Sequence, residues 1–174
     1  MPGRCQANPP AAAQCRWSRI GHVIVADTSA VLALLDFDSP DHASVRAAFR
    51  GHRSEWVLPW AILPELDYMV AKNGGPVAAQ ALCADLAEGR YVIEWGEAGD
   101  LERALELGRT YRDLSLGLVD GVVMAVAERL EARAIVTLDL RDFGAVTLKG
   151  RPEIWPRDLS TDRDPDPPRP IWPG

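Results

Sequence analysis

Short apolar runs alternate along the chain with longer segments that repeat apolar residues at helical spacing. The runs rich in β-branched and aromatic residues predict strands at 23–25, 55–58, 91–95 and 134–137, with a further edge strand from 145–148 and 153–155. Because strands and helices alternate, the pattern predicts a parallel sheet with helices on both faces. The expected fold class is therefore α/β.

Helical segments fill the gaps between the predicted strands. The expected helices cover 30–35, 40–50, 62–72, 76–88, 100–111 and 122–130. Ser39 is the expected N-cap of the second of these helices, with Pro40 at its first position. A stop at Gly74-Gly75 separates the third helix from the fourth, and these two are expected to form an antiparallel hairpin.

The length of 174 residues fits one globular domain with extensions. Residues 1–21 are rich in Pro, Ala and Arg, show no periodicity and are expected to form a flexible extension. Residues 22–157 are expected to form the domain, and the Pro-rich residues 158–174 a disordered tail.

The net charge of −6 argues against a protein that coats nucleic acid or binds anionic membranes, but not against an enzyme that contacts nucleic acid through local arginines. The three cysteines form no disulfide or zinc pattern, which favours the reducing cytoplasm. No apolar run approaches the about 20 residues of a membrane span, and the N-terminus lacks the apolar core of an export signal.

Four acidic residues differ from the other charges of the chain in their positions. Asp27 and Asp139 each follow a predicted strand, at the edge of an α/β sheet where ligands bind. Glu65 and Asp120 interrupt apolar helical segments. Each of the four has an ordinary local explanation, as a helix cap, a turn or a solvated helix residue. Together they are harder to explain, because a buried carboxylate is costly unless it is paired or bound to a cation.

The chemistry of such a group points to a hard divalent cation. Carboxylates brought together raise one another's pKa, and a divalent ion removes that penalty. Oxygen ligands without His or Cys select Mg²⁺ or Mn²⁺ over Zn²⁺, and an acidic pocket of this kind usually handles phosphates. The sequence contains no Walker-type phosphate loop, no dinucleotide-binding glycine motif and no Gly-x-Ser-x-Gly elbow.

Four short motifs, in this order, resemble those of PIN-domain ribonucleases, in particular the toxins of VapBC-type toxin–antitoxin pairs. They are Asp27-Thr28-Ser29-Ala30, Pro64-Glu65-Leu66, the segment 119–127 around Asp120, and Thr137-Leu138-Asp139 with Phe143 beyond it. The resemblance covers residues 23–155. It implies an α/β/α sandwich around a central, mainly parallel sheet of four to five strands, often as a homodimer.

The resemblance also implies an activity, a cofactor and partners. The implied activity is a Mg²⁺- or Mn²⁺-dependent endoribonuclease that cleaves tRNA or rRNA with a metal-activated water and so inhibits translation in the cytoplasm. Asp27, Glu65, Asp120 and Asp139 are the implied catalytic and metal-binding residues, with the hydroxyls of Ser29 and Thr137 orienting them. Asp142 is expected in a turn or a salt bridge. The implied partners are RNA and a small antitoxin that reaches the acidic pocket with an Arg.

Two other classes of function stay open at this point. One is a PIN-like interaction module with weak or no catalysis. The other is a different Mg²⁺-dependent α/β phosphohydrolase or a phospho-receiver; a dehalogenase-like phosphatase needs an acid where Ser29 stands, and a receiver needs a lysine for which Lys149 is the nearby candidate. Contacts to a nucleic-acid substrate are expected from arginines at the rim, with Arg109, Arg112, Arg133 and Arg141 as candidates.

Overall fold

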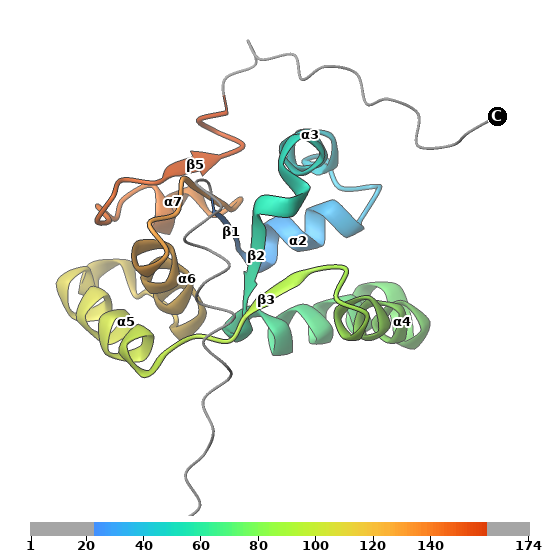
Figure 1. The fold of residues 1–174 in the computed structure, drawn as a ribbon, viewed down its shortest axis with the longest axis horizontal. Coiled ribbons are helices and arrows are strands. Elements are labelled where there is room, and N and C mark those ends of the chain that lie inside the picture. The colour runs from blue at the N-terminus through green and yellow to red at the C-terminus, as the bar shows by residue number, and fades with distance from the viewer. Residues whose placement is uncertain (1–22, 160–174) are drawn as a thin grey trace, which may run out of the picture.

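A parallel sheet of five strands forms the centre of the molecule in the computed structural model, which describes residues 23–159 (Figure 1). The strands are β1 (Ile24–Ala26), β2 (Trp56–Pro59), β3 (Val92–Glu94), β4 (Ala134–Val136) and β5 (Glu153–Trp155). Their order across the sheet is β3-β2-β1-β4-β5, and every neighbouring pair is parallel. The expected α/β class with a parallel sheet is confirmed.

Helices cover both faces of this sheet (Figure 1). They are α2 (Thr28–Leu35), α3 (His42–His52), α4 (Leu63–Ala87), α5 (Ala98–Thr110), α6 (Leu118–Arg129) and α7 (Leu140–Phe143), joined in places by the 3₁₀ turns η1 (Arg53–Glu55), η2 (Trp60–Ile62) and η3 (Arg112–Leu114). Helices α3 and α4 both pack against α2 on one side, and α5 packs along α6 on the other. The α/β/α sandwich that the resemblance implies is therefore observed.

The core lies between the sheet and these helices. All residues of β1, β2 and β4 are buried, and α6 adds an unbroken buried run over residues 121–127. Gly121 is the first residue of this run. A Cβ at this position would lie 3.0 Å from the Cβ of Ala104 on α5, which is tighter than ordinary packing, so the glycine lets the two helices approach closely. This close approach of two helices fixes the first turn of α6, which carries Asp120.

Helix α4 bends back on itself at Gly75. This glycine has a φ of +80°, which interrupts the helical geometry just before Pro76. Beyond the bend, Sγ of Cys83 lies 3.8 Å from Oδ1 of Asp67. In a straight helix, the rise over the same separation of 16 residues would be about 24 Å. The two arms of α4 therefore lie side by side, as expected for the hairpin.

Three local expectations were wrong. Ser39 is not the N-cap of α3; its hydroxyl accepts the N–H of Asp41 in the turn before that helix begins. Residues 145–148 form no strand, because the chain turns there after α7 and the N–H of Ala145 bonds to the carbonyl of Asp142. Helix α6 begins at Leu118 and not at residue 122, so Asp120 lies inside its first turn.

The ends of the chain are only partly described. The expected extension over residues 1–21, and the expected tail from residue 160 onward, lie outside the described residues. The first two tail residues are described: Oδ2 of Asp158 accepts the N–H of Ile154, and Leu159 packs against the core. Between residues 23 and 159, none of the helices has both the length and the apolar character that crossing a membrane requires.

Candidate active site

Two of the four predicted acids lie at the carboxyl ends of neighbouring strands. Strand β1 pairs with β4 so that Ala26 stands opposite Val136. Asp27 follows β1 directly, and its N–H donates to the carbonyl of Val136 at 2.9 Å. Asp139 follows the end of β4 after Thr137 and Leu138. The parallel register therefore brings Asp27 and Asp139 to the same edge of the sheet.

Two hydroxyl groups join the ends of these strands at Asp27, which is 5% exposed. Oδ2 of Asp27 accepts hydrogen bonds from Oγ of Ser29 at 2.7 Å and from Oγ1 of Thr137 at 3.0 Å. The Ser29 hydroxyl in turn accepts the N–H of Leu138 at 2.9 Å, and the Thr137 hydroxyl accepts the N–H of Asp139 at 3.0 Å. Both hydroxyls named from the sequence thus contact Asp27, and the same atoms shape the turn that leads to Asp139.

Glu65 reaches this edge from α4. Helix α4 follows β2, which lies next to β1 in the sheet, so the first turn of α4 comes close to the start of α2. Oε2 of Glu65 accepts a hydrogen bond of 2.7 Å from Oγ1 of Thr28, the residue after Asp27. Thr28 was not a candidate from the sequence, because an uncharged residue at the start of a helix carries no signal beyond capping.

Asp120 lies half-buried among like charges at the start of α6. Its Oδ2 accepts the N–H of Gly117 at 3.0 Å, so the carboxylate also closes the first turn of the helix. Burial raises the pKa of Asp120 above its ordinary value, and the hydrogen bond from Gly117 opposes this shift. The negative charges of Asp27, Asp139 and Asp142 raise the pKa of Asp120 further. Asp120 therefore belongs to the same electrostatic group as these three acids.

Asp139 caps the short helix α7 and leads to a further buried acid. Its Oδ1 accepts the N–H groups of Arg141 and Asp142, each at 3.1 Å. Asp142 is 8% exposed, and its Oδ1 lies 3.4 Å from Nε of Arg141, an ion pair of the kind expected for it. The charge of Asp142 also acts on Asp120, so the acidic group extends beyond the four residues named from the sequence.

The carboxylates keep oxygen atoms available for a cation. Asp27 and Asp120 use Oδ2, and Asp139 uses Oδ1, for the hydrogen bonds above; within residues 23–159 the second oxygen of each accepts none. Within this range, no group of three or more acidic, His or Cys side chains is arranged so that it could by itself hold a metal ion. Mg²⁺ usually takes one or two carboxylates and keeps several waters. The donor set, all carboxylate oxygen, therefore fits a hard divalent ion held by few protein ligands.

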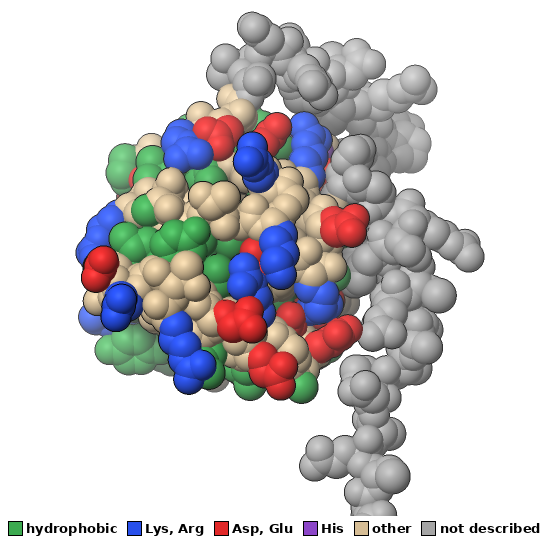
Figure 2. Space-filling view, turned by 90° about the vertical axis from the view of Figure 1, so that its left-hand side faces the viewer, with side chains coloured by type: hydrophobic (Ala, Val, Ile, Leu, Met, Phe, Trp, Pro, Cys, Tyr) green, Lys and Arg blue, Asp and Glu red, His purple; other side chains and the backbone are tan. Residues whose placement is uncertain are grey.

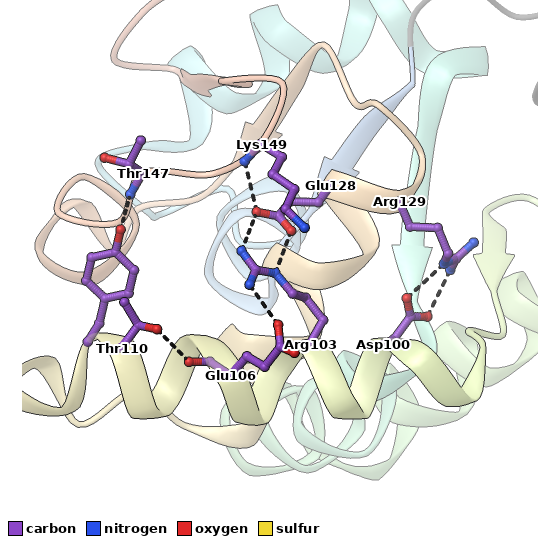
Figure 3. Close-up of polar contacts among 9 residues, drawn as sticks. Asp100, Arg103, Glu106, Thr110, Glu128, Arg129, Thr147 and Lys149 are labelled. Atoms are coloured by element: carbon purple, nitrogen blue, oxygen red, sulfur yellow. Dashed lines mark hydrogen bonds and ion pairs between the residues drawn. The ribbon is translucent and has the colours of Figure 1, made fainter.

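Other buried charges serve the packing of α5 against α6 (Figure 3). Arg103 on α5 donates Nε and Nη2 to the two oxygens of Glu128 on α6, at 2.7 and 3.0 Å. Arg129 on α6 holds Asp100, which is 3% exposed, in the same bidentate way. These pairs were not predictable from local patterns, because charged residues on amphipathic helices are usually solvated. Their carboxylates are neutralised by arginine, which sets them apart from the acids at the sheet edge.

The candidate rim arginines differ in position. The Arg141 side chain, next to Asp139, is 75% exposed. Arg133 directly precedes β4, at the opposite end of that strand from Asp139, and its guanidinium stacks on Trp155 at 5.1 Å from the ring centroid. The expectation that Arg133 lies at the acidic rim was therefore wrong. The face drawn in Figure 2 carries basic, acidic and apolar side chains interspersed, and shows no continuous basic surface among the described residues.

Comparison with known proteins identifies the family. The PIN domain family model matches residues 24–147. Ribonuclease VapC26 of Mycobacterium tuberculosis is 34% identical to this chain over 123 residues, which is 71% of this chain and 91% of that protein. The family match thus spans both strand ends and both helix starts that carry the four acids.

Solved structures share the fold at lower identity. VapC20 of Mycobacterium tuberculosis, a sarcin-ricin loop cleaving toxin, has a TM-score of 0.64 at 21% identity, over 74% of this chain and 99% of that one. DNA-bound VapBC from Salmonella typhimurium has a TM-score of 0.58 at 18% identity, over 76% of this chain and 96% of that one. The family model and the relationship to VapC26 show that this chain belongs to the PIN-domain family.

Proposed function

We propose that this chain is the toxin of a toxin–antitoxin pair, an endoribonuclease that works with Mg²⁺ or Mn²⁺ at the edge formed by Asp27, Glu65, Asp120 and Asp139. The observation that carries the proposal is that the ends of β1 and β4 bring Asp27 and Asp139 to one edge of the sheet, where the Thr137 hydroxyl contacts both and their charges also act on Asp120. A relative of this chain, VapC26, is a ribonuclease, which supports RNA as the substrate.

The metal-binding residues have distinct tasks in this proposal. When bound, the divalent ion supplies the positive charge that activates a water and offsets charge on the leaving oxygen of a phosphodiester. Asp27 and Asp120 are the main ligands, and Glu65 and Asp139 complete the pocket directly or through water. Hydrolysis then leaves 5′-phosphate and 3′-hydroxyl ends and needs no protein nucleophile.

The hydroxyls of Ser29 and Thr137 act on Asp27 rather than on the substrate. Because both hydrogen bonds end on Oδ2, they hold the carboxylate in one orientation and leave Oδ1 for the cation. Thr137 also fixes the N–H of Asp139, so one buried hydroxyl positions two of the acids.

Substrate contacts come from the rim. The guanidinium of Arg141 is exposed and lies against Asp142 in α7, the short helix that Asp139 caps, where an RNA phosphate flanking the cleaved bond would pass. The positive charge that contacts RNA comes from individual arginine side chains such as this one, because the chain as a whole carries a net charge of −6.

The partners in this proposal are RNA, a small antitoxin in the same cytoplasm and a second copy of the chain in a homodimer. Support for the antitoxin comes from the fold, which this chain shares with the toxins of VapBC complexes such as the one from Salmonella typhimurium. The acidic pocket is complementary to an arginine from such an antitoxin, because it offers carboxylate oxygens that no cation holds within residues 23–159.

The test is cleavage of end-labelled tRNA and rRNA by the purified protein with Mg²⁺ or Mn²⁺. Wild type should cut and leave 5′-phosphate ends, Asp120→Asn should be inactive, and Asp38→Asn, which changes an exposed aspartate in the loop after α2, should cut like wild type. Undiminished cleavage by Asp120→Asn would show that the site is misassigned. An inactive wild type that shows no acid-dependent Mn²⁺ binding would instead favour the interaction module.

A growth assay tests the toxin role separately. Expression of the wild-type chain should arrest growth, and co-expression of the antitoxin encoded next to it should relieve the arrest. Normal growth at high expression, with cleavage intact in the test tube, would contradict the toxin role and leave the nuclease chemistry standing.

A further inference from the structure

Thr28 contacts the acidic group without carrying charge. It is the first residue of α2 and is 6% exposed, so its hydroxyl has little access to water. That hydroxyl donates a hydrogen bond of 2.7 Å to Oε2 of Glu65, which is 37 positions away in the sequence. A short bond from a hydroxyl to a carboxylate is among the stronger hydrogen bonds of proteins.

Glu65 depends on this contact more than the other acids depend on theirs. The three aspartates are held by backbone N–H groups of their own helices or by the hydroxyls around Asp27. Glu65 is an exposed residue with a long side chain, and within residues 23–159 the Thr28 hydroxyl is its only hydrogen-bond or ion-pair partner. Without that bond the carboxylate would turn into the solvent, as glutamates on helix surfaces usually do.

The side chain of Thr28 is suited to hold a flexible partner. Threonine is β-branched and has few χ1 positions open to it in a helix, and the burial of Thr28 restricts it further. The hydroxyl therefore points in a fixed direction. Because it binds Oε2, the second oxygen of Glu65 accepts no hydrogen bond within residues 23–159.

We infer that Thr28 is a positioning residue that holds Glu65 at the acidic edge and thereby raises the affinity of the site for its divalent cation. The inference rests on the proposed function and deepens it. Thr28 touches neither substrate nor metal; it acts through Glu65 alone. Partners of this kind typically change metal affinity about 10- to 100-fold when they are removed.

The test is Mn²⁺ titration by calorimetry of wild type, Thr28→Val, Thr28→Ser, Glu65→Gln and the double variant Thr28→Val/Glu65→Gln. Thr28→Val keeps the shape and removes the donor, so the dissociation constant for Mn²⁺ should rise about tenfold or more. Thr28→Ser restores the donor and should bind like wild type. In the Glu65→Gln background, Thr28→Val should have no further effect, because the residue through which it acts is already altered.

A matched control separates positioning from a general loss of structure. Thr110→Val removes the hydroxyl of an exposed helical threonine that bonds to the carbonyl of Glu106, and it should leave Mn²⁺ affinity unchanged. Circular dichroism should show the same helix content for all variants. A positioning role also predicts that high Mn²⁺ restores RNA cleavage by Thr28→Val, whereas a merely structural role does not.

Two results overturn the inference. One is wild-type affinity in Thr28→Val; the other is a loss in Thr28→Val that adds fully to that of Glu65→Gln, because the threonine would then act on something else. In both cases the proposed function stands if Asp120→Asn, titrated alongside, loses Mn²⁺ binding. Equal Mn²⁺ binding by Asp120→Asn and wild type would contradict the proposed function instead, and absence of binding in wild type would overturn both.

Discussion

The hydroxyl of Thr137 donates a hydrogen bond of 3.0 Å to Oδ2 of Asp27, across 110 positions of the sequence. Thr137 is fully buried, and its oxygen also accepts the N–H of Asp139 at 3.0 Å. One side chain therefore connects the ends of β1 and β4 and shapes the turn between β4 and α7. The acidic edge is thus built by hydrogen bonds between strand ends rather than by any one segment.

Replacing Thr137 by valine should lower both stability and cleavage. The variant keeps the volume but leaves Oδ2 of Asp27 and the N–H of Asp139 each short of a partner, which should reduce the free energy of unfolding by about 1–3 kcal/mol. Urea denaturation measures the loss. Thr147→Val, which alters an exposed threonine, is the control, and equal urea midpoints for the two variants would contradict the assigned role of Thr137.

The charge of Asp120 should destabilise the metal-free protein. Its pKa is raised by burial and by neighbouring carboxylates, so the native state binds a proton more readily than the unfolded chain, and stability falls as pH rises through this range. Asp120→Asn removes the charge and keeps an acceptor for Gly117. In EDTA at pH 7 the variant should therefore melt at a higher temperature than wild type, with the gain disappearing as pH falls below 3.8, the ordinary pKa of the group. A lower melting temperature at pH 7 would contradict the electrostatic argument.

The ion pair between α5 and α6 should show the opposite dependence on pH. Burial of Glu128 opposes its ionisation, but the hydrogen bonds from Arg103 and from the N–H of Lys149 outweigh it, and the pKa of Glu128 is lowered (Figure 3). Its contribution to stability is present above the unfolded-state pKa and lost as pH falls through the folded one.

Glu128→Gln should therefore cost about 1–3 kcal/mol at pH 7, because it weakens the bonds to Arg103 and Lys149. The difference from wild type should shrink in acid. Urea denaturation at several pH values measures it, with Glu102→Gln, an exposed glutamate of α5, as the control. A deficit that stays constant down to acid pH would mean that the charge of Glu128 does not stabilise the helix pair.

Arg141 should contribute to RNA binding and not to the chemical step. Arg141→Ala should raise KM with kcat retained, and should reduce the slope of log affinity against log salt by about one. Arg50→Ala is the control, because Arg50 lies in the last turn of α3, which leads to the amino end of β2, away from the acids. Equal effects of the two substitutions would assign Arg141 to general surface charge.

Much of the fold was predictable because its signals are local. The β-branched runs at β1 and β4 and the Gly-Pro break in α4 depend only on neighbouring residues, and they lie close to where they were expected. Asp27 and Asp139 were also predictable, because an acid within a few residues after a core strand of a parallel sheet comes to the ligand-binding edge.

The contacts that shape the site were not predictable in the same way. Thr28 gains its role from Glu65, and Arg129 from Asp100, at separations that only the folded chain reveals. Arg133 precedes the strand predicted at 134–137, so its placement at the rim was an error of interpretation; its stacking on Trp155 is what only the folded chain reveals. Local patterns identify acids with unusual surroundings, whereas tertiary packing decides which partners they meet.

The most direct test of the proposed metal site is calorimetry. Mn²⁺ is titrated into the purified wild-type protein, Asp27→Asn and Asp120→Asn, each in buffer freed of other metals. The two aspartates lie on different elements, β1–α2 and α6, and in the proposed function a shared cation makes their proximity favourable. We predict that wild type binds Mn²⁺ and that each single substitution raises the dissociation constant for Mn²⁺ about tenfold or more, as is typical of changes around a metal site. Wild-type affinity in both variants would contradict the claim that these carboxylates share one divalent cation.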